Sequence, residues 1–234
     1  MKTYKNMKKS IITIICALFC LSMFAQRDVI PVKWKDIKHA VKKDADNVKK
    51  QVERLSAVEF DTLMTFEERI LAFYGQSVLL TDRGNTEVRR SEQSFNKKDY
   101  KNALAQAEAA LAINPLNIRA LRLVAYSIPK LLDAKEECKY TIADGQVFYN
   151  RMMRCLNTIA ATGLGTEKAP FYVTSIDDEY EFMRFYLDIW EYKSQRLIGD
   201  CDVFNLGETS EYYSQPTLYF NCERVLELEL EMFK

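Results

Sequence analysis

The chain has 234 residues, in which 33 lysines and arginines balance 33 aspartates and glutamates, and it contains a single histidine. The first 25 residues contain four lysines and no acidic residue, so the rest of the chain has a net charge of −4. This charge argues against a nucleic-acid partner, because binding to phosphates needs a basic face. One histidine, His39, leaves little material for a Ser-His-Asp triad or a histidine-rich metal site. We therefore expect a globular protein that is not an enzyme and has no cofactor.

The first 25 residues have the pattern of a secretory leader. A lysine-rich start precedes an apolar run from Ile11 to Ala25, and charged sequence returns at once. This run is shorter than the about 20 apolar residues that a membrane-spanning helix needs. We predict a cleaved signal peptide over 1–25, with an uncleaved N-terminal anchor as the alternative. The protein would then be exported, periplasmic or associated with the outer envelope, without a membrane span after leader removal.

The segment that follows the leader is predicted to be helical. Apolar residues recur at steps of three and four between Trp34 and Leu55, which predicts one long amphipathic helix. Thr65 and Glu68 form a capping-box pattern, which predicts a short helix that ends near Gly75.

The clearest architectural pattern is an alanine-rich helix over Tyr100–Ile113. Ala103, Ala107 and Ala110 place small side chains on one helix face. Pro115 follows at the position where tetratricopeptide (TPR) repeats carry a proline. We interpret this helix as the second helix of a TPR-like repeat, whose first helix begins near Thr86.

The repeat pattern stops soon after this helix. A further first helix reaches Ile128, where Pro129 is predicted to interrupt it. A long helix is then predicted from Lys135 to Ala161, ended by Gly163. Because about three repeats are needed to bury a continuous core, the flanking segments must cap this short array.

The composition changes near Ala169, and strands become the favoured elements. We predict a strand at Phe171–Thr174, a helix at Asp177–Tyr186, strands at Glu191–Ile198, Asp200–Leu206 and Thr217–Phe220, and an ambiguous last segment. A final helix capped by Asn221 is weakly favoured over an edge strand there. Of the cysteines outside the leader, only Cys201 and Cys222 are a candidate disulfide pair, and buried free thiols are favoured over a bridge.

The predicted fold class is mainly α: a TPR-like helical array with a small mixed α/β C-terminal portion. The predicted organisation is one fused domain over 26–234, made of N-terminal helices (26–80), a TPR-like core (86–162) and an α+β C-terminal part (169–234).

Several segments together resemble one family. They are TLMTFEE and FYG near residue 70, INPLNIRALR at Ile113–Arg122, the Gly163–Gly165 turn with APFYV, and then DEYEF, CDVFNL and LYFN. In this order they resemble an uncharacterised domain-of-unknown-function group of secreted proteins from Bacteroides-type bacteria, from about Trp34 onward. The resemblance implies a periplasmic or envelope location and a helical repeat-like body, and it carries no functional residue.

The favoured function is a non-catalytic interaction or scaffold module of the cell envelope. Helical repeats present a concave surface to peptides or proteins, and the basic residues Lys97, Arg119 and Arg122 are candidates to hold an acidic peptide. The partner itself is unknown.

Two alternatives remain open. The first is a glycan or small-molecule binding protein, in which Trp190, Tyr192, Tyr212 and Tyr213 would stack on sugar rings. The second is a carboxylate-based hydrolase or metal enzyme, because paired carboxylates can do acid-base chemistry and can bind calcium. Its candidate residues are Asp177, Asp178, Glu179, Glu181, Asp200 and Asp202.

Overall fold

The computed structural model describes residues 29–232, so the predicted signal peptide lies outside the described residues. Within this range the chain forms nine helices and one four-stranded sheet. The helices are α2 (Trp34–Lys43), α3 (Ala45–Ser56), α4 (Phe66–Leu79), α5 (Asn85–Asn96), α6 (Tyr100–Ile113), α7 (Ile118–Asp133), α8 (Ile142–Ala160), α9 (Ile176–Phe185) and α10 (Glu223–Met232). The mainly α fold with a small mixed sheet is confirmed.

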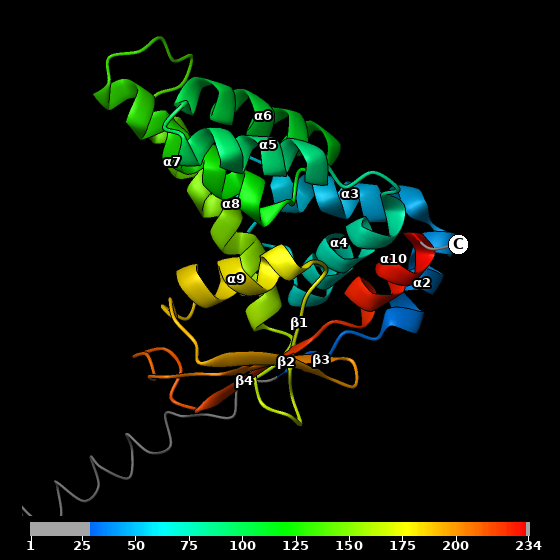
Figure 1. Cartoon of the computed structure of the whole chain (residues 1–234). Coiled ribbons are helices and arrows are strands. Elements are labelled where there is room, and N and C mark those ends of the chain that lie inside the picture. The colour runs from blue at the N-terminus through cyan, green and yellow to red at the C-terminus, as the bar shows by residue number, and fades with distance from the viewer. Residues whose placement is uncertain (1–28, 233–234) are drawn as a thin grey trace, which may run out of the picture.

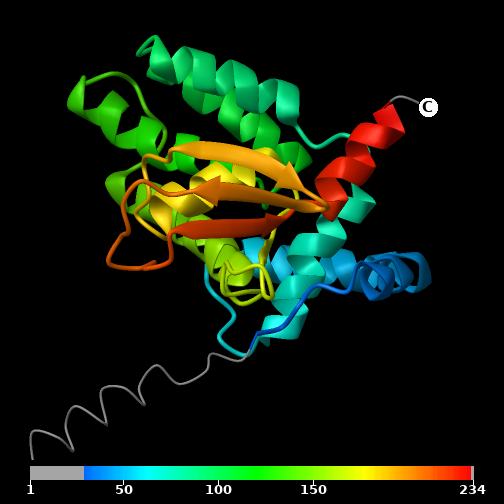
Figure 2. The same ribbon diagram turned by 60° about the horizontal axis from the view of Figure 1, so that its bottom comes forward.

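The sheet is built from β1 (Phe171–Tyr172), β2 (Ser194–Ile198), β3 (Cys201–Asn205) and β4 (Thr217–Asn221). The strand order is β1-β4-β3-β2, in which β1 runs parallel to β4 and the other pairs are antiparallel. The helical part lies over one face of the sheet, with α9 nearest to it (Figure 1). Figure 2 shows the opposite face of the sheet turned toward the viewer, with α9 behind it.

Helix α9 is enclosed between the sheet and the central helices. The ring of Phe182 lies 4.7 Å from the ring of Phe171 and 6.0 Å from the ring of Phe220, which anchors one helix face to the sheet. Another face of α9 meets α7. The ten residues of α9 therefore reach both layers of the molecule.

Helices α5 to α8 follow one another in space as they do in sequence. Each helix packs against the next, and α5 also touches α7. Ala103, Ala107 and Ala110 are fully buried on α6, as their spacing predicts. A larger hydrophobic core runs from Val32 to Val225 and joins the N-terminal helices, α8, α9 and the sheet.

The prediction of one long helix over Trp34–Leu55 is wrong, because the segment forms two helices, α2 and α3. Asp44 leaves the helical conformation with φ −152° and ψ 75°. Its carboxylate accepts a hydrogen bond from the backbone N–H of Asn47 at 2.9 Å and so begins α3. The apolar spacing continues across this break, so spacing alone does not reveal it.

Pro129 does not interrupt α7, which continues to Asp133. A proline inside a helix costs about 3 kcal/mol, because it removes one hydrogen bond and crowds the preceding turn. Ile128 and Leu131 are 0% and 1% exposed in the same region. Burial of each such side chain contributes about 1.5–3 kcal/mol, which offsets the cost.

Helix α8 begins at Ile142 and not at Lys135. Lys135 has a positive φ of 57° just beyond the end of α7. Thr141 and Asp144 then form a capping box that starts α8. The helix ends at Ala160, one residue before the predicted Ala161. Gly163 does not have the positive φ of a C-terminal glycine cap; it is required for close approach, because a Cβ added there would lie 2.1 Å from the backbone oxygen of Pro170.

The remaining local predictions hold with small changes of length. Thr65 and Glu68 form the predicted capping box, and α4 extends to Leu79. The last segment is a helix, in which Asn221 Oδ1 accepts the backbone N–H of Glu223. All four described cysteines are free, so Cys201 and Cys222 form no disulfide. No described helix is long and apolar enough to cross a membrane.

Candidate functional site

A network of arginines and carboxylates joins α5, α7 and α9. Arg122 Nε donates to both oxygens of Glu181, at 3.1 and 2.9 Å, and Arg119 Nε donates to the same carboxylate at 3.1 Å. Arg122 also binds Glu92 of α5 at 2.6 Å, and Arg119 binds Asp177 at 2.9 Å. The network links α5 and α9 through the arginines of α7.

The network is largely withdrawn from water. Glu181 is fully buried and Arg122 is 8% exposed. Burial alone would lower the pKa of Arg122, but the neighbouring carboxylates of Glu181 and Glu92 outweigh it and raise that pKa. Arg122 therefore stays charged, and the ion pairs hold the helices together.

A cleft of about 630 Å³ opens beside this network, between α5, the start of α9 and α10. Its walls combine apolar side chains with charged ones. The apolar lining residues are Val88, Ile176, Val225 and Leu228, and the charged ones are Asp82, Arg83, Arg89, Glu92, Arg119, Asp177 and Glu229. Such a mixture suits a ligand with both apolar and polar groups.

The three residues predicted to bind a partner lie in different surroundings. Arg119 lines the cleft, although its guanidinium is bound to Glu181 and Asp177. Arg122 is buried behind it, and Lys97 is exposed at the C-terminal end of α5. The two arginines therefore hold α7 to α9 beside the cleft through their ion pairs. Contact of Lys97, Arg119 or Arg122 with a partner stays a prediction.

The aromatic candidates separate into exposed and buried residues. Trp190 and Tyr192 line an open hollow of about 760 Å³, and Trp190 is 60% exposed. Tyr212 is 66% exposed. Tyr213 is buried, and its hydroxyl lies within hydrogen-bonding distance of the backbone oxygens of Gly165 and Thr217, so it is part of the packing.

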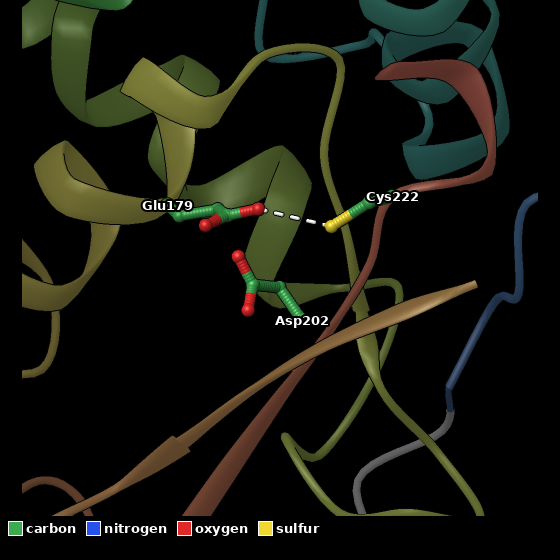
Figure 3. Close-up of side chains that lie close together, drawn as sticks. All are labelled: Glu179, Asp202 and Cys222. Atoms are coloured by element: carbon green, nitrogen blue, oxygen red, sulfur yellow. Dashed lines mark hydrogen bonds between the residues drawn. The ribbon is translucent and has the colours of Figure 1, made fainter. Parts of the chain in front are cut away.

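Two of the candidate carboxylates meet a cysteine between α9 and the sheet. Figure 3 shows Glu179, Asp202 and Cys222 turned toward one another. Cys222 Sγ donates to Glu179 Oε1 at 3.0 Å, and one ligand atom from each residue lies within 4.8 Å of the others. Burial raises the pKa of Glu179 to about 8 and also raises the pKa of the Cys222 thiol.

The two remaining candidates are Asp178 and Asp200. Asp178 accepts hydrogen bonds from the backbone N–H and the hydroxyl of Thr174 at the start of α9. The backbone oxygen of Asp200 accepts the N–H of Cys222 at 2.7 Å. Five of the six carboxylates are therefore divided among three local environments, and Asp200 takes part only through its backbone.

Two functional candidates escaped the sequence analysis. Glu92 completes the arginine network, and Cys222 completes the cluster with Glu179. The sequence does contain a pattern that points to the cluster. Glu179 precedes the apolar Phe182 and Met183 by three and four residues, so it lies on the same buried face of α9. A glutamate on an apolar face needs a polar partner.

The family model described as Domain of unknown function (DUF4919) matches residues 35–231. Neither a curated protein nor a solved structure matches the chain. The predicted resemblance to an uncharacterised domain is thus confirmed, whereas secretion and a Bacteroides-type source stay predictions. Because the matched range includes most of the sequence, the chain belongs to the DUF4919 family of domains of unknown function.

Proposed function

We propose that this protein is a non-catalytic interaction module of the cell envelope, which holds a segment of a partner protein in the cleft between α5, α9 and α10. The observation that carries the proposal is the cleft itself, with its apolar wall and charged rim. Its volume of about 630 Å³ lies within the range of about 300–1,000 Å³ typical of ligand pockets. That volume accommodates a few side chains of a peptide.

The chemistry of the lining suggests what the peptide carries. Ile176 is 45% exposed although it is apolar, so an apolar side chain of the partner would cover it. Arg89 is exposed and forms no ion pair with any residue in the range 29–232. An acidic group beside an apolar residue would satisfy both positions.

The arrangement of α5, α6 and α7 supports a TPR-like interpretation of the helical core. In that repeat family a first helix packs on its own second helix and on the next first helix. Contacts of α5 with both α6 and α7 are of this kind. The cleft lies along α5, the helix that corresponds to a first helix.

A site-specific photocrosslinking experiment tests this proposal. Photoreactive p-benzoylphenylalanine at Gln93, which lines the cleft, is compared with the same group at Leu63, which is 85% exposed outside it. We expect a discrete crosslinked species from Gln93 alone in the native envelope. The additional substitution Arg89→Glu should abolish this species, whereas Lys101→Glu on α6 should leave it unchanged. Equal crosslinking from both positions, or no effect of Arg89→Glu, would contradict the proposal.

A second candidate function is glycan binding at the hollow lined by Trp190 and Tyr192. Exposed aromatic faces next to carboxylates can stack on sugar rings and accept their hydroxyl groups. Asp188 and Glu208 supply such acceptors in the same hollow. A glycan array with the wild type and Trp190→Ala tests this function. We expect the wild type to bind a glycan, Trp190→Ala to lose this binding, and Tyr212→Ala, which lies outside the hollow, to retain it. If the wild type bound no glycan on the array, glycan binding would be excluded.

A further inference from the structure

We propose that Glu179, Asp202 and Cys222 form a binding site for a single zinc ion between α9 and the sheet. The three residues come from α9, β3 and the position just after β4. Their side chains converge on one point (Figure 3), and a ligand atom of each lies within 4.8 Å of the other two. Zinc lies about 2.0–2.3 Å from each carboxylate or thiolate ligand, so two ligands of one ion are at most about 4.6 Å apart. The three side chains would therefore close slightly around a bound ion.

The backbone positions all three residues independently of any ion. Asp202 pairs with Phe220 across β3 and β4, so it faces the same side of the sheet as Phe220, which contacts α9. The residue two positions after Phe220 on that side is Cys222, whose N–H is held by the backbone oxygen of Asp200. Glu179 meets them from above because it shares a helix face with Phe182.

A polar atom without a partner points to a ligand at this position. Glu179 is fully buried, and its Oε2 has no hydrogen-bond partner among the described residues. No arginine or lysine in the range 29–232 forms an ion pair with Glu179 or Asp202. An ionised carboxylate buried here without a partner would be costly, so either a proton or a cation must neutralise it. A cation between Glu179 and Asp202 would supply the missing partner.

The ligand set selects the kind of metal. Calcium and magnesium prefer oxygen ligands alone, whereas a cysteine thiolate favours zinc and other softer metals. Zinc accepts cysteine and carboxylate ligands in a tetrahedral arrangement, in which a water molecule or Glu179 Oε2 would take the fourth position. Binding replaces the thiol proton of Cys222 and the proton of Glu179 by Zn²⁺, and both protons pass to solvent.

The surroundings provide support and access. Gln195 donates its side-chain N–H to Asp202 and orients that carboxylate, as residues around metal ligands commonly do. Asp202 is partly exposed, which leaves a route for the ion from solvent. With zinc bound, the three ligands would tie α9 to the edge where β3 and β4 meet.

Metal titration of the purified chain tests the site. The protein is stripped with a chelator, then titrated with Zn²⁺ by calorimetry and with Co²⁺ by absorption spectroscopy at neutral pH. We expect one Zn²⁺ per chain, a rise in melting temperature, and a sulfur-to-cobalt charge-transfer band in the near ultraviolet. If the wild-type protein bound less than one Zn²⁺ per chain, or gave a cobalt spectrum without the sulfur band, the proposal would be overturned without any variant.

Variants then assign the ligands. Cys222→Ser should lose the sulfur-to-cobalt band. Cys201 is a free cysteine outside the cluster, so Cys201→Ser should retain the band. Glu179→Gln keeps the side-chain shape and should weaken zinc binding by about 100-fold or more, because loss of a residue that merely supports a ligand already costs about 10–100-fold. Circular dichroism verifies that each variant folds. Equal zinc binding by folded Cys222→Ser and Cys201→Ser would refute the assignment.

Discussion

Replacement of Glu181 by glutamine should strongly destabilise the protein. Glu181 is fully buried and accepts hydrogen bonds from Arg119 and Arg122. A hydrogen bond to a charged group contributes about 1.5–3 kcal/mol, so two arginine donors imply about 3–6 kcal/mol. Removal of one partner from a buried ion pair costs about 3–5 kcal/mol. We therefore expect Glu181→Gln to lower the free energy of unfolding by about 3–5 kcal/mol.

Urea denaturation followed by circular dichroism measures this loss. The midpoint should fall, and the melting temperature should drop by roughly 6–20 °C, since 1 kcal/mol corresponds to about 2–4 °C in a chain of this size. Asp177→Asn is the matched control, because that side chain is 43% exposed and pairs with Arg119 at 2.9 Å. An exposed pair contributes about 0–1 kcal/mol, so the control should remain close to wild type.

A double substitution separates the buried charge from the packing. Glu181→Leu combined with Arg122→Met removes both members of the closest pair and leaves no opposed charge between them. The double variant should be more stable than the sum of the single effects predicts, by about 0.5–3 kcal/mol. If Glu181→Gln unfolds within about 0.5 kcal/mol of wild type, or the two single effects simply add, then the network does not carry the stability assigned to it.

Three further substitutions test other parts of the fold. Arg54 lowers the pKa of Glu68 and of Asp61 through direct hydrogen bonds. The stability that these pairs add is present above the unfolded pKa values of about 4 and is lost as pH falls through the lower folded values, so thermal melts of wild type and Arg54→Met should differ at neutral pH and begin to converge only below about pH 4. Ala107→Leu should cost about 1–3 kcal/mol by overpacking, whereas Ala105→Leu on the exposed side of α6 should change the denaturation midpoint little. Gly163→Ala places a Cβ 2.1 Å from a backbone oxygen and should lower the melting temperature of the chain more than Ala107→Leu does.

Local signals in the sequence predict local structure well. The bounds of α6 agree with the predicted Tyr100–Ile113 because the alanine spacing, the N-terminal aspartate and the following proline all act within one helix. The hairpin of β2 and β3 was predicted for the same reason, since Gly199 supplies the positive φ of 59° that its turn requires. Such features depend on neighbours in the chain.

Features that depend on distant residues were predicted less well. The course of α7 through Pro129 depends on what buries Ile128. The start of α8 is a different case, because its capping box of Thr141 and Asp144 is a local signal that the sequence analysis overlooked. Cys222 joins Glu179 only because β4 lies beside β3 under α9. The sequence named two carboxylates of this cluster, but only strand register and helix docking bring the thiol to them.

Helix α9 connects the two sites, because its opposite faces carry different clusters. One face directs Asp177 and Glu181 to the arginines of α7, and the other directs Glu179 to the sheet. A movement of this ten-residue helix would therefore disturb both the cleft and the zinc ligands. Cys222→Ser and Arg89→Glu lie outside α9, so each should impair its own site alone. If either substitution abolished both the crosslink at Gln93 and zinc binding, the cause would be a displaced α9 and not the loss of a local contact.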